Sequence, residues 1–577
     1  MRARLFVPLV LLATACSDPS DPGSDHRGQL THDATWTRAG SPHVVHGSFP
    51  IWGGATLTIE AGATVLFDSA AGIAVGQPAG PGILRVLGTA EDPVVMKSLD
   101  SAAGPGAWFG LLFHSSTTSE LHHVTLEGCG TPHYLNVPPA CVVLGDPQKP
   151  TENPELLIDH VTLAQGRGTG LILYNQSRFA AGSTALSVLG MSADAARFRT
   201  REAARFPLGG TISGNDTNEV RLEADTLRDS LTLAAGVPWG IVGTLVVEGP
   251  KTPVLVIAAG NTIRLSASIE VGASAPGGLQ VGSPGGPRTV LLPRADWWQR
   301  LGFYAHAVSS GIWNTTLDHC GLVSTCVLIA GSFGGDPAPA PVLADVRIQN
   351  SGGSGLGLAN AGAPGPGSAN LTITGSSNWP IELSLSPVAA IPPGQYTGNI
   401  FDRVRILQAE VRQDETWPAL GVPYYVYNHI VVGDSVSHPT LTLLPGTTIY
   451  FEGAGTLSAG MPRPGAIHAV GTAQAPITFT ATSGLPGGWT GIVLGPAADS
   501  ATIFDHVVVD NGGAEYPVAG SFHFYVDLGP VIQHSSIQNS SGCGVLVVNQ
   551  PPWTTDFTAP ALGNSFSNNA GGDICGP

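Results

Sequence analysis

A polar pair that ends in histidine recurs at five places in the chain, each time beside a run of aliphatic residues. The pairs are His122-His123, Asp159-His160, Asp318-His319, Asp505-His506 and Gln533-His534. A histidine beside a carboxylate could transfer protons or bind a metal ion. A catalytic group is needed once, however, whereas a corner residue is needed in every turn of a repeating fold. We therefore interpret the pairs as structural corners.

The closest approach to an acidic active site is a short series of charged residues around position 221. Glu219, Glu223 and Asp225 alternate with apolar residues, and Arg221 lies between the two glutamates. Alternation in a strand places these side chains on one face, so we expect an exposed outer charge ladder. Residues 166–170 (Gly-Arg-Gly-Thr-Gly) lack the lysine and the following helix of a phosphate loop. The sequence alone therefore assigns no catalytic residue, metal ligand or cofactor.

Aromatic side chains could stack on sugars wherever they are exposed. The candidates considered are Trp297, Trp298, Trp489, Tyr424, Tyr425, Phe522, Phe524 and Tyr525. Trp108, Trp298 and Trp489 occupy equivalent repeat positions, which favours a role in the core or at a corner. Tyr134 and residues 522–525 are expected in loops that leave the repeat. We predict ligand contacts, on this ground alone, at Tyr134, Phe522, Phe524 and Tyr525.

The cysteines fall into close pairs once Cys16 is set aside. The pairs are Cys129 with Cys141, Cys320 with Cys326, and Cys543 with Cys575. An exported chain can form disulfides, and we predict three bridges. The first two would each close a loop that leaves the repeat, and the third would hold the final tail against the last turns. Zinc is the alternative, but the chain has no Cys-x-x-Cys motif.

One phrase occurs three times and indicates the architecture that holds all these residues. It reads Leu-Thr-Ile-Glu-Ala-Gly-Ala-Thr-Val-Leu-Phe at 57–67, Leu-Val-Ile-Ala-Ala-Gly-Asn-Thr-Ile-Arg-Leu at 255–265, and Leu-Thr-Leu-Leu-Pro-Gly-Thr-Thr-Ile-Tyr-Phe at 441–451. Each copy predicts a strand, a glycine corner and a second strand. We divide the chain into three modules, residues 28–216, 217–400 and 401–577, the last with a C-terminal cap.

The repeats, with short strands every 20–25 residues, resemble the right-handed parallel β-helix of bacterial surface lipoproteins. The resemblance covers essentially all of residues 30–577 and implies an all-β solenoid of roughly twenty turns, with a filled aliphatic interior. Residues 192–205 could instead form a basic amphipathic helix. We favour a strand there, followed by a short helical turn.

The first residues predict export and lipid attachment. Residues 1–15 combine two arginines, a short apolar run and small residues, as in a secretory signal peptide. Residues 12–16 (Leu-Ala-Thr-Ala-Cys) resemble a bacterial lipobox, which implies that Cys16 is acylated. The alternative is an ordinary signal peptide with a coincidental cysteine. Ser17 favours sorting to the outer membrane, and residues 16–27 are expected to form a flexible tether.

Charge and composition narrow the choice of partners. The net charge of −17 argues against nucleic acid, which requires a basic surface. The expected partners are the membrane, through the lipid anchor, and a polysaccharide or another surface protein; the sequence does not indicate an oligomeric state. We predict a non-enzymatic structural or adhesive role. The alternatives are a polysaccharide lyase or glycoside hydrolase on the same scaffold, and an ordinary periplasmic scaffold.

Overall fold

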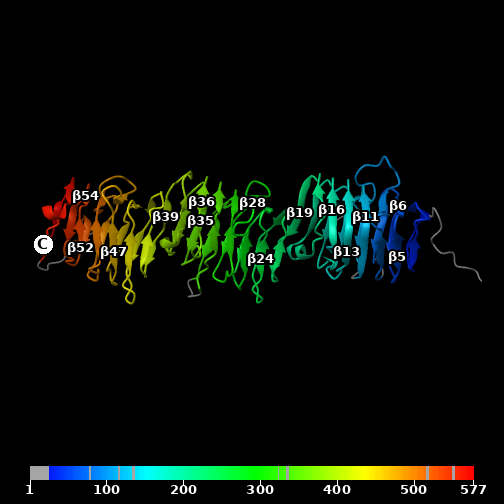
Figure 1. Cartoon of the computed structure of the whole chain (residues 1–577), viewed down its shortest axis with the longest axis horizontal. Coiled ribbons are helices and arrows are strands. Elements are labelled where there is room, and N and C mark those ends of the chain that lie inside the picture. The colour runs from blue at the N-terminus through cyan, green and yellow to red at the C-terminus, as the bar shows by residue number, and fades with distance from the viewer. Residues whose placement is uncertain are drawn as a thin grey trace, which may run out of the picture. The chain divides into compact units, whose positions relative to one another are not determined.

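The regular secondary structure of the chain is almost all β-strand, with about 2% of its residues helical. The computed structural model describes residues 25–76, 80–114, 117–132, 137–322, 324–332, 337–514, 519–548 and 553–576. Two compact units are present, Met1–Leu222 and Glu223–Pro577. Each unit is a parallel β-solenoid, and about 19 turns are present in total (Figure 1). The prediction of an all-β parallel solenoid is therefore confirmed.

The phrase that occurs three times forms the same local structure in each copy. The strand pairs are β5 (Thr56–Glu60) with β6 (Thr64–Phe67), β24 (Val254–Ile257) with β25 (Thr262–Leu265), and β44 (Thr440–Leu443) with β45 (Thr448–Phe451). The corner glycines Gly62, Gly260 and Gly446 have φ angles of 73°, 79° and 82°. This left-handed conformation is easily reached without a Cβ atom, which explains the glycine in each copy.

In the first unit, successive turns pair in parallel through one main sheet. Its strand order is β1-β3-β6-β9-β11-β13-β16-β18. The strands not yet defined are β1 (Asp25–His26), β3 (His43–Val45), β9 (Val94–Ser98), β11 (Thr118–Glu127), β13 (Glu155–Ala164), β16 (Thr184–Leu189) and β18 (Ile212–Ser213). The register of β11 on β13 places Val124 opposite Val161 and Leu126 opposite Leu163. Identical residue types thus stack from one turn to the next.

In the second unit, a sheet of 14 strands runs from β20 (Thr226–Leu227) to β56 (Ser565–Ser567). Its middle part contains β35 (Ser354–Ala359), β37 (Ile381–Ser384), β39 (Val404–Ile406), β42 (Tyr424–Val426), β45, β48 (Ile477–Ala481), β51 (Val507–Asp510) and β54 (Ser536–Gln538). These strands pair in parallel, in that order. The sheet therefore aligns one outward side chain from each turn.

The interior of each unit is a ladder of aliphatic and aromatic side chains. In β5 and β6, the residues Leu57, Ile59, Val65 and Phe67 are fully buried, and the residues between them are more exposed. This alternation is the pattern expected of a strand with one face in the core. The interior provides the main stabilising burial, because no turn could bury its apolar face alone.

The three equivalent tryptophans fill corresponding corners, as predicted. Trp108, Trp298 and Trp489 are fully buried. Each indole N–H donates to a backbone carbonyl about one turn further along, at distances of 2.8, 2.8 and 2.9 Å. The rings of Trp108 and Trp489 also stack on the last residue of the repeated phrase, Phe67 and Phe451, with centroids 4.0 and 4.4 Å apart.

All three predicted disulfides are present. Cys129 bonds to Cys141, Cys320 to Cys326, and Cys543 to Cys575, with Cα–Cα distances of 4.9, 4.8 and 5.9 Å. The first two each close a loop within a single turn, because the residues at both ends of the loop pair with the same preceding turn. The third joins β55 (Cys543–Val547) to β57 (Gly572–Cys575), which pair in parallel. This last bond holds the final strand on the preceding turn, as expected for a cap.

Two further local features bear on the sequence predictions. Residues 192–205 contain β17 (Asp194–Arg199) followed by a short 3₁₀ helix, Thr200–Arg205, so the preference for a strand with a helical turn is confirmed. The boundary between the two compact units falls after Leu222 in the sequence. The three modules remain a division of the sequence.

Among the residues that the structure describes, no helix has the length and apolar character to cross a membrane.

Candidate functional site

An open groove of about 760 Å³ lies on the surface of the second unit. It is lined by residues from consecutive turns and contains aromatic, charged and hydroxyl side chains. Its lining consists of Trp379, Phe401, Arg403, Tyr425, Glu452, Gly453, Ala454, Thr482, Ser483, Gly487, Gly488 and Ala514. The small residues of this set keep the groove shallow and open. Such a mixture suits an extended polar ligand that also has apolar faces.

The groove lies beside a row of outward side chains on β37, β39, β42 and β45. The register aligns Glu382, Arg405, Tyr425 and Tyr450 on successive strands. The next residues along each strand, Leu383, Ile406, Val426 and Phe451, are fully buried. Because neighbouring residues of a strand point to opposite faces, the row must lie on the outside of the sheet.

Three rings form a stacked platform in the groove. The indole of Trp379 lies 4.4 Å from the ring of Phe401 and 5.1 Å from that of Tyr425, measured between centroids. The planes of Trp379 and Tyr425 are 10° apart. Phe401 is 43% exposed, and Trp379 and Tyr425 are half-buried. The platform is therefore rigid and accessible, since ring contacts hold each member in place.

Two arginines lie beside the platform, one against its indole and the other against a tyrosine of the neighbouring row. Arg405 forms an ion pair with Glu382 at 2.6 Å, and its guanidinium lies 5.8 Å from the ring centroid of Trp379. Arg403 lies 5.2 Å from the ring of Tyr450. These distances are within the range of cation–π contacts, which favour a fixed ring orientation.

A hydrogen bond links the platform to the carboxylate of the groove. The hydroxyl of Tyr425 donates to Oε2 of Glu452. Burial, and then the hydrogen bond and the charge of Glu452, raise the pKa of Tyr425 to about 12. The phenol therefore remains protonated at neutral pH and acts as a donor, which leaves further acceptor capacity on Glu452 for a ligand hydroxyl.

The groove lacks the usual equipment of a glycosidase. Of the described residues that line it, Glu452 is the single carboxylate. Retaining and inverting hydrolases on the common pattern require two carboxyl groups on opposite sides of the scissile bond.

The ligand contacts predicted at residues 522–525 need correction. Phe522 and Phe524 lie in the strand β52 (Gly520–Phe524), not in a loop, and both are fully buried. Their rings pack in the interior against Phe504 and Phe557. Neither can present a ring face to a ligand, whereas Tyr525 is half-buried just after the strand. Tyr134 and Cys16 lie outside the described residues.

The charge ladder near position 221 is also less exposed than predicted. Val220 and Leu222 face the interior, as expected. Glu219, however, is only 2% exposed, and Arg221 lies 3.7 Å from Asp194 with both side chains largely covered. The prediction of an exposed ladder is therefore wrong for Glu219, which is buried. Alternation predicted the face of the sheet, but it could not predict what lies over that face.

The histidine pairs are corner residues, as proposed from the sequence. Their second members are His123, His160, His319, His506 and His534, with φ angles of 41°, 54°, 51°, 51° and 43°. A positive φ is uncommon for residues other than glycine, and histidine is among the types enriched there. The shared conformation explains why the pairs recur.

The groove itself was largely missed by the sequence argument. Tyr425 was among the aromatic candidates, but Trp379, Phe401, Arg403 and Glu452 were not. The available signal was the row from Glu382 to Tyr450, whose members follow one another at intervals of about one turn. Using it requires the register of each strand, which the variable corners conceal.

Comparison with known proteins adds no further assignment. No protein-family model matches the chain, and neither a curated protein nor a solved structure gives a significant match.

Proposed function

We propose that this protein is a non-enzymatic surface lipoprotein that binds a glycan chain in the groove of its second unit. The observation that carries the proposal is the stacked platform of Trp379, Phe401 and Tyr425. Sugar rings present apolar C–H faces that pack on flat aromatic rings, while their hydroxyls need polar partners. Arg403 and Glu452 provide such partners at the edge of the platform.

The open shape of the groove supports a polymer as ligand. A small molecule is usually enclosed over most of its surface, whereas this groove is lined on consecutive turns and remains open to solvent. A polysaccharide could lie across several turns and contact the groove residues of each turn with a different sugar unit. Rigid rings cost little conformational entropy on binding, which suits a preformed surface of this kind.

A glycan array probed with the purified protein tests this function, followed by titration of the best-bound glycan. We expect Trp379→Ala to weaken binding roughly tenfold or more, because one stacked ring contributes on the order of 1–2 kcal/mol. Tyr425→Phe keeps the ring and removes the hydroxyl, so its effect should be smaller. Trp297→Ala, which removes a half-buried tryptophan outside the groove, provides the matched control.

Unchanged binding in Trp379→Ala would contradict the groove as the site. Turnover of the bound polysaccharide would instead support the alternative of a carbohydrate-active enzyme. Purified protein also tests the proposed membrane attachment. If Cys16 is acylated, mass spectrometry should find a lipid-modified mature N-terminus. Loss of membrane association in Cys16→Ala is expected on the same ground.

A further inference from the structure

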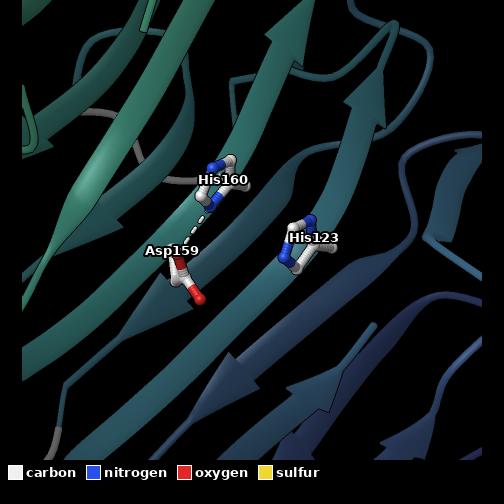
Figure 2. A group of neighbouring side chains, drawn as sticks. All are labelled: His123, Asp159 and His160. Atoms are coloured by element: carbon white, nitrogen blue, oxygen red, sulfur yellow. Dashed lines mark hydrogen bonds and ion pairs between the residues drawn. The ribbon is translucent and has the colours of Figure 1, made fainter. Parts of the chain in front are cut away.

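Two clusters of histidine and aspartate lie at corners of the solenoid, one in each unit. The first contains His123, Asp159 and His160, and the second contains Asp505, His506 and His534. In each cluster, the potential ligand atoms lie within 4.8 Å of one another. Figure 2 shows the first cluster, with Asp159 hydrogen-bonded to His160 and with His123 on the neighbouring strand. Two imidazoles and a carboxylate are a common ligand set for zinc.

The register of the strands brings the histidines of each cluster together. In the first cluster, β11 and β13 pair so that His122 lies opposite Asp159, which places His123 next to His160. Their rings are stacked, with centroids 4.6 Å apart and planes at 9°. In the second cluster, the rings of His506 and His534 are 5.0 Å apart at 27°.

In each cluster the aspartate contacts Nδ1 of at least one of the two imidazoles. Oδ1 of Asp505 lies 2.8 Å from Nδ1 of His506 and 2.9 Å from Nδ1 of His534. Asp159 makes the same contact with Nδ1 of His160 at 2.7 Å, and a second one with His122 at 3.1 Å. A carboxylate that accepts from Nδ1–H leaves the lone pair of Nε2 available to a metal ion.

The carboxylate of the first aspartate lies against the imidazoles of its corner, 2.7 Å from Nδ1 of His160 and 3.1 Å from Nδ1 of His122. The anionic carboxylate then contributes negative charge beside the imidazoles. This charge favours a bound cation and increases the basicity of the ligating nitrogens.

Other corners of the same molecule show that the architecture does not need two histidines. At Asp318, the partners are His319 at 2.8 Å and Asn350 at 3.0 Å. At Asp510, the partners are Asn511 at 2.9 Å and Asn539 at 2.8 Å.

These asparagines also have positive φ and donate to the aspartate as histidine does. The same corner is thus built with two, one or no imidazoles. Where two imidazoles lie together at one corner, they provide nitrogen ligands for a metal ion that the fold itself does not require.

We propose that each of the two histidine clusters binds one divalent transition-metal ion of the zinc type through its imidazole Nε2 atoms, with the aspartate beside them. Because stacked rings hold their lone pairs in parallel planes, one ring must turn about its Cβ–Cγ bond to face the ion, and this ring exchanges its hydrogen bond to the aspartate for the ion. His160 and His534 have 56% and 52% of their side chains exposed, which leaves room for this rotation. The torsion is soft in histidine.

A third group, His114 with Asp146 and Glu152, does not meet the same conditions. His114 is buried, and burial lowers its pKa despite its hydrogen bond to Glu152. The ammonium of Lys149 already lies 3.3 Å from Glu152. A resident cation beside the carboxylate disfavours a second one, so we expect two ions per chain.

Calorimetric titration of the chelator-treated, full-length protein with zinc chloride tests the proposal. The expected stoichiometry is two ions per chain. His160→Asn and His534→Asn should each reduce it to one, and the double variant should reduce it to none. Asparagine is the suitable replacement because Asn511 follows Asp510 as His160 follows Asp159. Asn539 contacts Asp510 from the next turn, as His534 contacts Asp505, so the positive-φ backbone is kept in both variants.

His319→Asn is the matched control, since it removes a corner histidine that has no histidine neighbour, and two ions should still bind. Circular dichroism of each variant checks that the fold is intact. Absence of zinc binding to the wild type, or two ions bound by the double variant with an intact fold, would overturn the proposal. A variant that loses both its fold and its zinc is replaced by His123→Asn or His506→Asn, for which the same loss of one ion is required.

Discussion

The tryptophans of this protein fall into two groups that meet opposite demands. Trp108, Trp298 and Trp489 recur at equivalent positions, are fully buried and donate to a backbone carbonyl of a neighbouring turn. Trp379 belongs to no such set, lies in the outer groove and stacks on Phe401 and Tyr425. The difference teaches that residues repeated at equivalent positions of successive turns form the stacked strands and corners of the solenoid, which we call the wall. Aromatic residues outside that repetition are better candidates for function.

The largest expected effect separates the two groups by stability. Trp489→Ala should lower the free energy of unfolding by about 3–5 kcal/mol, because it leaves a cavity and an unpaired carbonyl at Asp510. Trp379→Ala should change it by less than about 1 kcal/mol, as at other surface positions. Chemical denaturation of both variants measures the contrast. Equal losses would show that Trp379 also supports the wall.

The next effect concerns a loop that belongs to the wall and not to the groove. Replacing Cys129 and Cys141 together with serine should cost about 2–4 kcal/mol, since the bridge closes a loop of 12 residues in the unfolded chain. The groove lies in the other unit, so glycan binding should be unaffected at temperatures where the variant is folded. Thermal unfolding and array binding of the same preparation check both parts. A parallel loss of binding would contradict the separation.

Much of the wall could be predicted from the sequence because its physics repeats. Many turns require the same features, namely a glycine with positive φ, a buried tryptophan and a row of aliphatic residues. The same residue types therefore recur in the same order along the sequence. Gly62, Gly260 and Gly446 show this directly. The disulfides followed the same logic, since two of the three pairs occupy equivalent places in their repeats.

The groove could not be predicted in the same way, because it depends on relations between turns. Phe522 was expected in a loop, but it lies in β52, where all five residues are buried and no alternation marks an outer face. Glu219 was expected to be exposed, yet it is 2% exposed. The register between turns decides which side chains align on the surface, and corners of variable length conceal that register in the sequence.

The smallest expected effect concerns the pH dependence of the solenoid interior, where protonation of a buried histidine replaces a mutation as the perturbation. His26 is buried in the first turns, where its ring stacks on Trp36 at 4.1 Å and Nε2 lies 3.1 Å from Nδ1 of His43. Burial, and then the charge of His43, lower the pKa of His26 from 6.5 to about 4, although Asp25 opposes the shift. The folded state therefore prefers the neutral ring.

The unfolded chain accepts this proton near pH 6.5, so the stabilisation is complete above that pH and declines as the pH falls towards 4. We expect the protection factors of the amides in β1 and β3, which correct for the intrinsic effect of pH on exchange, to fall across this window before those of the later turns, because a solenoid can open locally from one region. His26→Phe keeps the ring stack and removes the titration, so its protection factors should depend less on pH. The remaining slope is assigned to His43, whose pKa burial also lowers. Identical pH profiles in the wild type and His26→Phe would show that the buried ring carries no such linkage, and that the interior is as tolerant of charge as the outer face.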